Sequence, residues 1–386
     1  MLFSLTIYGL TAAILTVLGY VSYLNSCRNL GLNRSFFSWE NCAIVGVFGT
    51  VCGLRYNVGV DYKAYLEYFL TYQRFGEFTF KSEWLFESLT KLVSFMSLGP
   101  STWFAIIACI QIGCFYFAFK DHRYLYPFFS LIIVLGPHYL VWMNGMRQIL
   151  ASAIFMIAIR YILSRRLIWF LSVIICASLF HKSAIILLAL YFIPNRDYFK
   201  NRTFTIALIF SSIALGSINL VSDYVNEISF IANFIGYENV SYHLSNLVNE
   251  SAVKSWGPRN LLLIFTAVLL AWTSREVKDY YKSDVFLIFY NMTIASVIFG
   301  NVLMNAHNIF LRPIIYLNMT SIVTCAFTLY FLFIHGSSKY YGLLFFALLL
   351  SVVMYMPLSV VADYGKSSID FTNYKTILFQ DLSSFK

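Results

Sequence analysis

The first twenty residues, MLFSLTIYGLTAAILTVLGY (residues 1–20), contain no charged side chain and decide how the rest of the chain is interpreted. An apolar run of about 20 residues is long enough to cross the hydrocarbon core of a bilayer as a helix. The run has no positively charged start and no small-residue cleavage site, which a secretory signal peptide would have. We therefore expect it to be the first membrane helix.

Similar apolar runs recur along the whole chain. Apolar residues make up 59% of the 386 residues and charged residues only 12%, whereas soluble domains hold roughly 45–50% and about 25%. The composition predicts one all-α polytopic membrane domain over residues 1–386, with about twelve transmembrane helices in a range of roughly 10–14. The expected spans lie near 2–24, 40–54, 99–119, 125–143, 149–163, 167–181, 183–194, 203–220, 259–274, 284–304, 313–334 and 340–360.

The stretch 167–194 leaves two alternatives open. Its two apolar runs are shorter than the roughly 20 residues of a straight crossing. They are either two tilted helices or one span with a re-entrant hairpin.

The distribution of Lys and Arg predicts the orientation, because short cytoplasmic loops carry an excess of these residues. One set of alternate loops, taken with Arg160, holds 14 basic and six acidic residues, so we assign it to the cytoplasm. The basic residues of these loops are Arg28, Arg34, Lys120, Arg123, Arg165, Arg166, Arg196, Lys200, Arg202, Arg275, Lys278, Lys282 and Lys339. The formal net charge of +9 thus reflects topology, and its scattered basic residues do not predict nucleic-acid binding.

The opposite, outward side holds the longest polar segments: two loops, 55–98 and 221–258, and a tail, 361–386. In the first loop, Glu83, Trp84, Glu87 and Lys91 punctuate an apolar helical pattern that is typical of a helix lying at the membrane interface. The second loop is acidic. Long loops on one face indicate chemistry or binding at that surface.

Three arginines lie where membrane rules disfavour them. Arg147 in NGMRQ, Arg259 in WGPRN and Arg312 in FLRP are all outward, and each is expected at a helix N-terminus. The positive-inside rule and the helix dipole both oppose a cation there, so a negative partner is expected. Helix N-termini bind anions, and a guanidinium offers a bidentate fork for phosphate. The pattern favours a diphosphate site, with Arg55 nearby; the alternative is that each arginine reaches lipid headgroups or pairs with a loop carboxylate.

Two further residues are candidates for proton transfer. His181, in SLFHKSA, lies at an outward turn, and Asp61 follows Arg55 and Gly59 in RYNVGVDY (residues 55–62). Either could act as a general base toward a sugar hydroxyl. Equally, His181 could be a hydrogen-bonded structural residue, and Asp61 could pair with Arg55 or Arg147.

We predict neither a metal nor another cofactor. No histidine or carboxylate pair has the spacing of a metal site. The seven cysteines are odd in number, lie mostly inside apolar runs and form no CxxC pair, so neither a disulfide framework nor a zinc site is predicted.

These motifs carry a family resemblance. RYNVGVDY at 55–62, the arginine–glutamine pair at 147–148, FHKSA at 180–184, and Arg312 with Tyr316 four residues later resemble the EpsG/Wzy group of bacterial polysaccharide polymerases. The matching features extend from about residue 50 to residue 375.

The resemblance implies an O-antigen or exopolysaccharide polymerase of lipopolysaccharide-type biosynthesis, located in the bacterial inner (cytoplasmic) membrane with its site facing the periplasm. Such an enzyme moves the growing glycan from undecaprenyl diphosphate onto a new lipid-linked repeat unit, and a separate membrane protein regulates chain length. The resemblance also implies a GT-C-like architecture and a metal-independent, inverting transfer. Arg147, Arg259 and Arg312, with Arg55 and Tyr316, would bind diphosphate; Asp61 or His181 would be the base. The alternatives are a flippase or exporter of lipid-linked sugars, or an O-antigen ligase.

Overall fold

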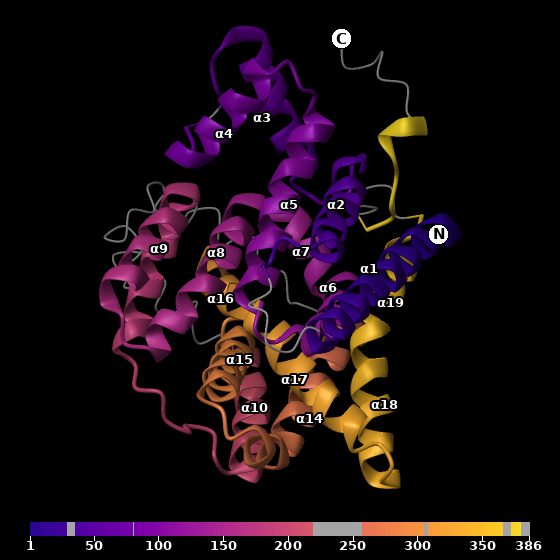
Figure 1. Ribbon diagram of the computed structural model, residues 1–386, viewed down its shortest axis with the longest axis vertical. Coiled ribbons are helices and arrows are strands. Elements are labelled where there is room, and N and C mark those ends of the chain that lie inside the picture. The colour runs from indigo at the N-terminus through magenta and orange to yellow at the C-terminus, as the bar shows by residue number, and fades with distance from the viewer. Residues whose placement is uncertain (29–34, 80, 219–256, 305–307, 366–371, 380–386) are drawn as a thin grey trace. The chain divides into compact units, whose positions relative to one another are not determined.

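The computed structural model describes residues 1–386 except 29–34, 80, 219–256, 305–307, 366–371 and 380–386 (Figure 1). In this part of the chain every regular element is a helix. The helices form two compact units, unit 1 (Met1–Ile193 with Leu332–Lys386) and unit 2 (Pro194–Phe331). Most of the expected second loop and part of the expected tail lie outside the described residues.

Unit 1 contains the N-terminal half of the chain and its C-terminal helices. Its elements are α1 (Leu2–Arg28), α2 (Trp39–Gly53), α3 (Tyr62–Phe75), α4 (Trp84–Phe95), α5 (Pro100–Ala118), η1 (Arg123–Leu125), α6 (Tyr126–Leu135), α7 (His138–Asn144), α8 (Met146–Leu163), α9 (Leu167–Phe180), η2 (Lys182–Phe192), α18 (Lys339–Val353), α19 (Tyr355–Asp363) and η3 (Ile377–Phe379). Helix α1 packs on α2 and α6, α5 packs on α2 and α8, and α8 packs on α9.

Small residues let these helices approach closely, as is common where lipid surrounds a bundle. At Gly53, at the end of α2, an added Cβ would lie 2.6 Å from the Ser101 carbonyl oxygen of α5. Polar side chains join α1 to α2, where Ser22 Oγ donates to Asn41 Oδ1 at 2.9 Å. The α2–α5 contact therefore depends on a glycine, and the α1–α2 contact includes a buried hydrogen bond.

Unit 2 is built from α10 (Arg202–Ser217), α14 (Pro258–Tyr281), α15 (Asp284–Val302), α16 (Asn308–Asn318) and most of α17 (Thr320–Ile334). Helix α15 packs against α10, α14 and α16. Between α15 and α17, the buried hydroxyls of Thr293 and Thr324 are hydrogen-bonded at 2.8 Å. A buried hydroxyl pair of this kind satisfies polar groups that lipid could not.

The prediction of a multi-pass helical membrane protein is confirmed, but the predicted number of membrane spans is not. Seven helical stretches of the described residues are long and apolar enough to cross a membrane, or eight if α6 and α7 form one bent span. The expected twelve spans are not confirmed, because α2, α9, η2 and α10 hold only 15, 14, 11 and 16 residues. Within 167–194, the structure forms a helical hairpin of α9 and η2 with His181 at the turn.

Two expected spans differ from the observed helices. The span predicted at 125–143 is broken between α6 and α7, which are bent by 66°, because Gly136 and Pro137 interrupt the helix. Arg312 was expected to stand just before a helix that starts at Pro313. Instead α16 begins at Asn308, so Arg312 lies inside that helix and Pro313 is tolerated in its second turn. The N-terminal placement predicted for Arg312 is therefore wrong.

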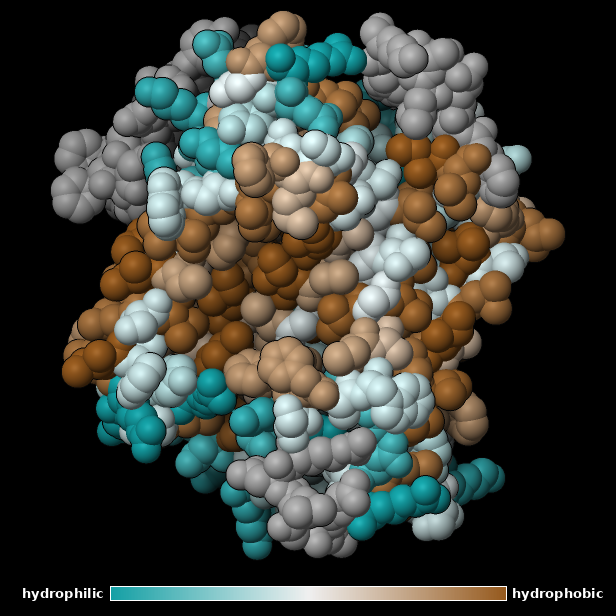
Figure 2. Space-filling model, turned by 45° about the horizontal axis from the view of Figure 1, so that its top comes forward, coloured by the Kyte–Doolittle hydropathy of each residue, from teal (hydrophilic) through white to brown (hydrophobic). Residues whose placement is uncertain are grey.

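The surface fits a lipid environment. Figure 2 shows hydrophobic side chains (brown) over much of the face drawn, with hydrophilic ones (teal) gathered in patches. Large apolar side chains remain exposed on single helices, including Leu2 of α1 (76%), Ile168 of α9 (79%) and Leu343 of α18 (69%). In lipid these side chains incur no hydrophobic penalty.

Candidate functional site

The loop 55–98 contains two amphipathic helices, α3 and α4, that pack on α5. Their buried faces form an aromatic core around Trp103, including Tyr68, Phe69 and Phe86, each fully buried. The rings of Phe86 and Trp103 meet edge to face at 5.5 Å between centroids, a favoured arrangement for aromatic pairs. This core fixes the start of α4, where Glu83 lies.

The segment before α3 folds against the break between α7 and α8. Gly59 has φ +96°, and an added Cβ there would collide with the Asn144 side chain at the end of α7. Arg55, only 1% exposed, donates from Nη2 to the Met143 carbonyl at 3.2 Å and also contacts the Met143 sulfur. Its guanidinium lies 4.8 Å from the Phe104 ring centroid. The buried cation thus binds the C-terminal turn of α7, where the helix dipole is negative.

Arg147 is the second residue of α8, as predicted. Its Nη1 donates to Glu83 Oε2 at 2.8 Å and to Ser82 Oγ at 3.3 Å. The Tyr65 hydroxyl of α3 is also hydrogen-bonded to Arg147. Of the two alternatives for this arginine, the pairing with a loop carboxylate is therefore present.

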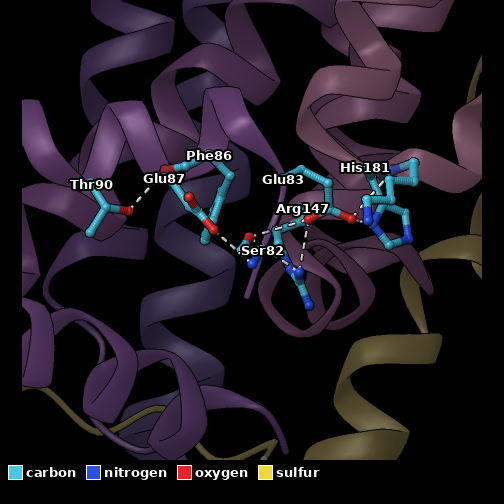
Figure 3. A network of polar contacts seen from close by, with 8 residues as sticks. Ser82, Glu83, Phe86, Glu87, Thr90, Arg147 and His181 are labelled. Atoms are coloured by element: carbon cyan, nitrogen blue, oxygen red, sulfur yellow. Dashed lines mark hydrogen bonds and ion pairs between the residues drawn. The ribbon is translucent and has the colours of Figure 1, made fainter. Parts of the chain in front are cut away.

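His181 reaches the same carboxylate from the turn between α9 and η2. Its Nδ1 lies 2.9 Å from Glu83 Oε1, and the Lys182 backbone N–H donates to that oxygen at 3.3 Å. In Figure 3 the Glu83 carboxylate lies between Arg147 and the His181 ring, with Ser82 on the same side as Arg147. Two residues predicted separately from the sequence thus meet at one acidic side chain.

The carboxylate at the centre stays ionised. Burial of Glu83 opposes its negative charge, but the hydrogen bond from His181 and the positive charge of Arg147 outweigh this and lower its pKa to about 2. The Glu83 side chain is only 8% exposed. Its charge is therefore compensated by the groups around it rather than by water.

Asp61 is exposed at the N-cap position of α3, where a negative charge interacts favourably with the helix dipole. Its carboxylate is near enough to Tyr65 to influence that hydroxyl, whose pKa is raised mainly by burial and also by Asp61. Tyr65 therefore lies between Asp61 and Arg147. The sequence motif that contains Asp61 is thus linked to the Glu83 network through one tyrosine.

The remaining predicted residues belong to unit 2. Arg259 is half-buried as the second residue of α14, which begins at Pro258 after Gly257, as expected. Arg312 is exposed, and Tyr316, one turn later in α16, is fully buried. The other predicted site residues belong to unit 1: Arg55, Asp61, Arg147 and His181.

Glu83 is the residue that the sequence interpretation did not select. It appeared only as one of several polar residues in an expected interfacial helix. A signal was nevertheless present: an acidic residue directly before a helix start, in an outward loop on the same side as three arginines for which a negative partner is expected. In the described residues no group of three or more His, Cys, Asp or Glu side chains could hold a metal ion.

The arrangement offers two chemical capabilities. A guanidinium at a helix N-terminus can bind phosphate oxygens, and an imidazole whose Nδ1 is held by a carboxylate can exchange a proton at Nε2. Both groups lie at helix ends, and their side chains are partly exposed, 23% for Arg147 and 14% for His181. Fold and site together define a multi-pass membrane protein with a compact network of Arg147, Glu83 and His181.

The comparison with known families names that class. Residues 41–376 match the EpsG family, so the chain belongs to this family, as the resemblance predicted. The family includes Wzy-like polysaccharide polymerases, and the chain is accordingly a polysaccharide-polymerase-type membrane protein. No curated protein and no solved structure matches the chain.

Proposed function

We propose that this protein extends a bacterial glycan at the periplasmic face of the inner membrane. It moves the growing chain from undecaprenyl diphosphate onto the non-reducing end of a new undecaprenyl-diphosphate-linked repeat unit. The observation that supports this best is the joint attachment of Arg147 and His181 to Glu83. A phosphate-binding cation and a proton acceptor side by side suit the transfer of a sugar from a diphosphate.

The proposed role of Arg147 is to bind the diphosphate leaving group. As the anomeric C–O bond breaks, negative charge accumulates on the phosphate oxygens, and a fixed cation stabilises it most at that stage. Arg147 is preorganised by Glu83 and Ser82 and stands at the N-terminus of α8, whose dipole adds to its field. In unit 2, Arg259 and Arg312 with Tyr316 are the diphosphate candidates.

His181 is the proposed base, with Asp61 as the alternative. The Nδ1 atom of His181 is held at 2.9 Å by a carboxylate, which is the usual way a catalytic imidazole is oriented. Asp61 is exposed at the start of α3. Direct attack by the acceptor hydroxyl would invert the anomeric centre.

The test is glycan extension by purified protein in nanodiscs, with defined lipid-diphosphate repeat units and products sized on gels. Arg147→Gln is expected to lower the rate about 10²-fold or more, because it removes a preorganised charge from the transition state. Arg259→Gln and Arg312→Gln test the same role in unit 2. Asp61→Asn and His181→Ala separate the two bases.

Arg202→Gln is the matched control. Arg202 also opens a helix, α10, but it pairs with Glu276 on the side that we assign to the cytoplasm. Its replacement should leave extension unchanged. Wild-type rates in folded Arg147, Arg259 and Arg312 variants alike would refute the diphosphate assignment.

A further inference from the structure

Glu83 occupies the N-cap position of α4 without capping the helix. Its backbone is extended (φ −86°, ψ 144°), as at many helix starts, but its side chain makes no hydrogen bond to the first turn. An N-cap side chain commonly accepts from a backbone N–H two or three residues ahead. Here both carboxylate oxygens point away from α4, toward α8 and α9 (Figure 3).

Four donors converge on those two oxygens. Oε1 accepts from His181 Nδ1 at 2.9 Å and from the Lys182 N–H at 3.3 Å. Oε2 accepts from Arg147 Nη1 at 2.8 Å and from Ser82 Oγ at 3.2 Å. A glutamine has only one oxygen, which the charged Arg147 would bind, so its N–H₂ would face His181 Nδ1 and the Lys182 N–H. Only an ionised carboxylate satisfies both sides.

The charge of Glu83 decides the tautomer of His181. An ionised carboxylate can only accept hydrogen bonds, so the histidine nitrogen beside it must carry a proton. That nitrogen is Nδ1. The proton state that remains free to change is therefore the one at Nε2, on the far side of the ring.

We propose that Glu83 is the positioning residue of this site: it holds His181 with Nδ1 protonated and Nε2 ready to accept a proton, and it fixes Arg147 beside that ring. This inference rests on the proposed function. In the transfer, the acceptor O–H bond breaks and its proton goes to Nε2, while the acceptor oxygen bonds to the anomeric carbon. The bond from that carbon to the diphosphate breaks, and its electron pair leaves on the diphosphate oxygen.

The first test is spectroscopic and needs no activity. In ¹⁵N-histidine-labelled protein, the His181 signals are assigned by their loss in His181→Ala. Wild-type protein at neutral pH is expected to show a protonated Nδ1, and Glu83→Gln is expected to shift His181 toward the Nε2-protonated form. An identical tautomer in wild type and Glu83→Gln would overturn the proposal, whatever reaction the protein performs.

The second test is kinetic and uses Glu87→Gln as the control. Glu87 lies one turn along α4, and its Oε1 accepts only the Ser82 N–H, at 2.8 Å, in the contacts seen here. Glu83→Gln is expected to lower kcat at least about tenfold, and at most by the roughly 10²–10⁴-fold that a positioned base contributes, whereas Glu87→Gln should keep kcat within about twofold.

A double variant distinguishes positioning from a separate role. If Glu83 acts through His181, adding Glu83→Gln to His181→Ala should change kcat by less than about twofold. Fully multiplicative losses in kcat would contradict this proposal. Absence of extension by wild-type protein would instead refute the proposed function, and the tautomer measurement would still decide the role of Glu83.

Discussion

The carboxyl group of Glu83 links local electrostatics to the stability of unit 1. Its pKa falls from the ordinary value of 4.5 to about 2, because hydrogen bonding from His181 and the charge of Arg147 outweigh the cost of burial. A carboxyl group whose pKa is lowered by folding stabilises the native state above the unfolded pKa. That stabilisation is lost as the pH falls through the folded pKa.

We therefore predict that acid weakens unit 1 between about pH 4.5 and about pH 2. A pKa difference of this size corresponds to about 3 kcal/mol, present in full at neutral pH. The measurement is the unfolding temperature in detergent, followed by circular dichroism from pH 7 downward. The difference between wild type and Glu83→Gln should shrink across this range, and a pH-independent difference would contradict the assigned ionisation.

The same network shows what the sequence predicts and what it does not. Arg147 is a candidate because its placement violates the rules for cations at outward helix N-termini, and His181 because it is an ionisable residue at an outward turn near the membrane. Glu83 violates no such rule. Its partners are 64 and 98 positions away in the chain, and no local spacing encodes contacts over such separations. The individual candidates could be predicted, but the residue that joins them required the fold.

Among the elements, the break between α7 and α8 determines where Arg147 stands. Gly145 separates the two helices, and Arg147 follows two residues later. Arg55 donates to the Met143 carbonyl of α7 and contacts the sulfur of Met146, the first residue of α8, at 3.3 Å. The buried guanidinium therefore contacts residues on both sides of the break between α7 and α8.

Replacing Arg55 by Leu is predicted to loosen this break. It removes a charge-assisted hydrogen bond to a carbonyl at a helix C-terminus, with an expected loss of about 1–3 kcal/mol. A lower unfolding temperature and a higher KM for the lipid-linked donor should appear together, because Arg147 would be less firmly placed. Arg160→Gln is the control, since Arg160 lies on the surface at the opposite end of α8, over the ring of Tyr161.

A higher unfolding temperature in Arg55→Leu would contradict this role. It would mean that removing a charge from an apolar interior outweighs its hydrogen bonds, as happens for some buried ionic groups. The two outcomes have opposite signs, so the measurement decides between them. A higher KM for the lipid-linked donor without any loss of stability would favour direct diphosphate binding by Arg55.

The element boundaries were predictable where composition alone determines them. The long runs of α1, α5 and α15 end within a few residues of their expected limits. Breaks depend on local backbone chemistry instead. Gly136 with Pro137 splits one expected span, whereas Pro313, which was expected to start a helix, lies within α16. A proline is compatible with either outcome, and the surrounding packing selects between them.

For the whole molecule, the decisive prediction is orientation. Every loop rich in Lys and Arg is assigned to the cytoplasm, which places the first turn of α3 and the turn at His181 outside. The hairpin of α9 and η2 starts and ends near Arg166 and Asn195. Both ends lie on the same side whether the hairpin crosses the bilayer or only enters it, so the loops that flank it keep the same assignment in either case.

Single cysteines in a cysteine-free background test this orientation in intact cells. Lys63→Cys, exposed in the first turn of α3, should react with a membrane-impermeant maleimide added outside. Arg166→Cys and Lys282→Cys should react only after the membrane is permeabilised. Labelling of Arg166→Cys from outside would invert the topology and move the Glu83 site to the cytoplasmic face, where no periplasmic repeat unit could reach it. The proposed polymerase activity would then fail with the orientation.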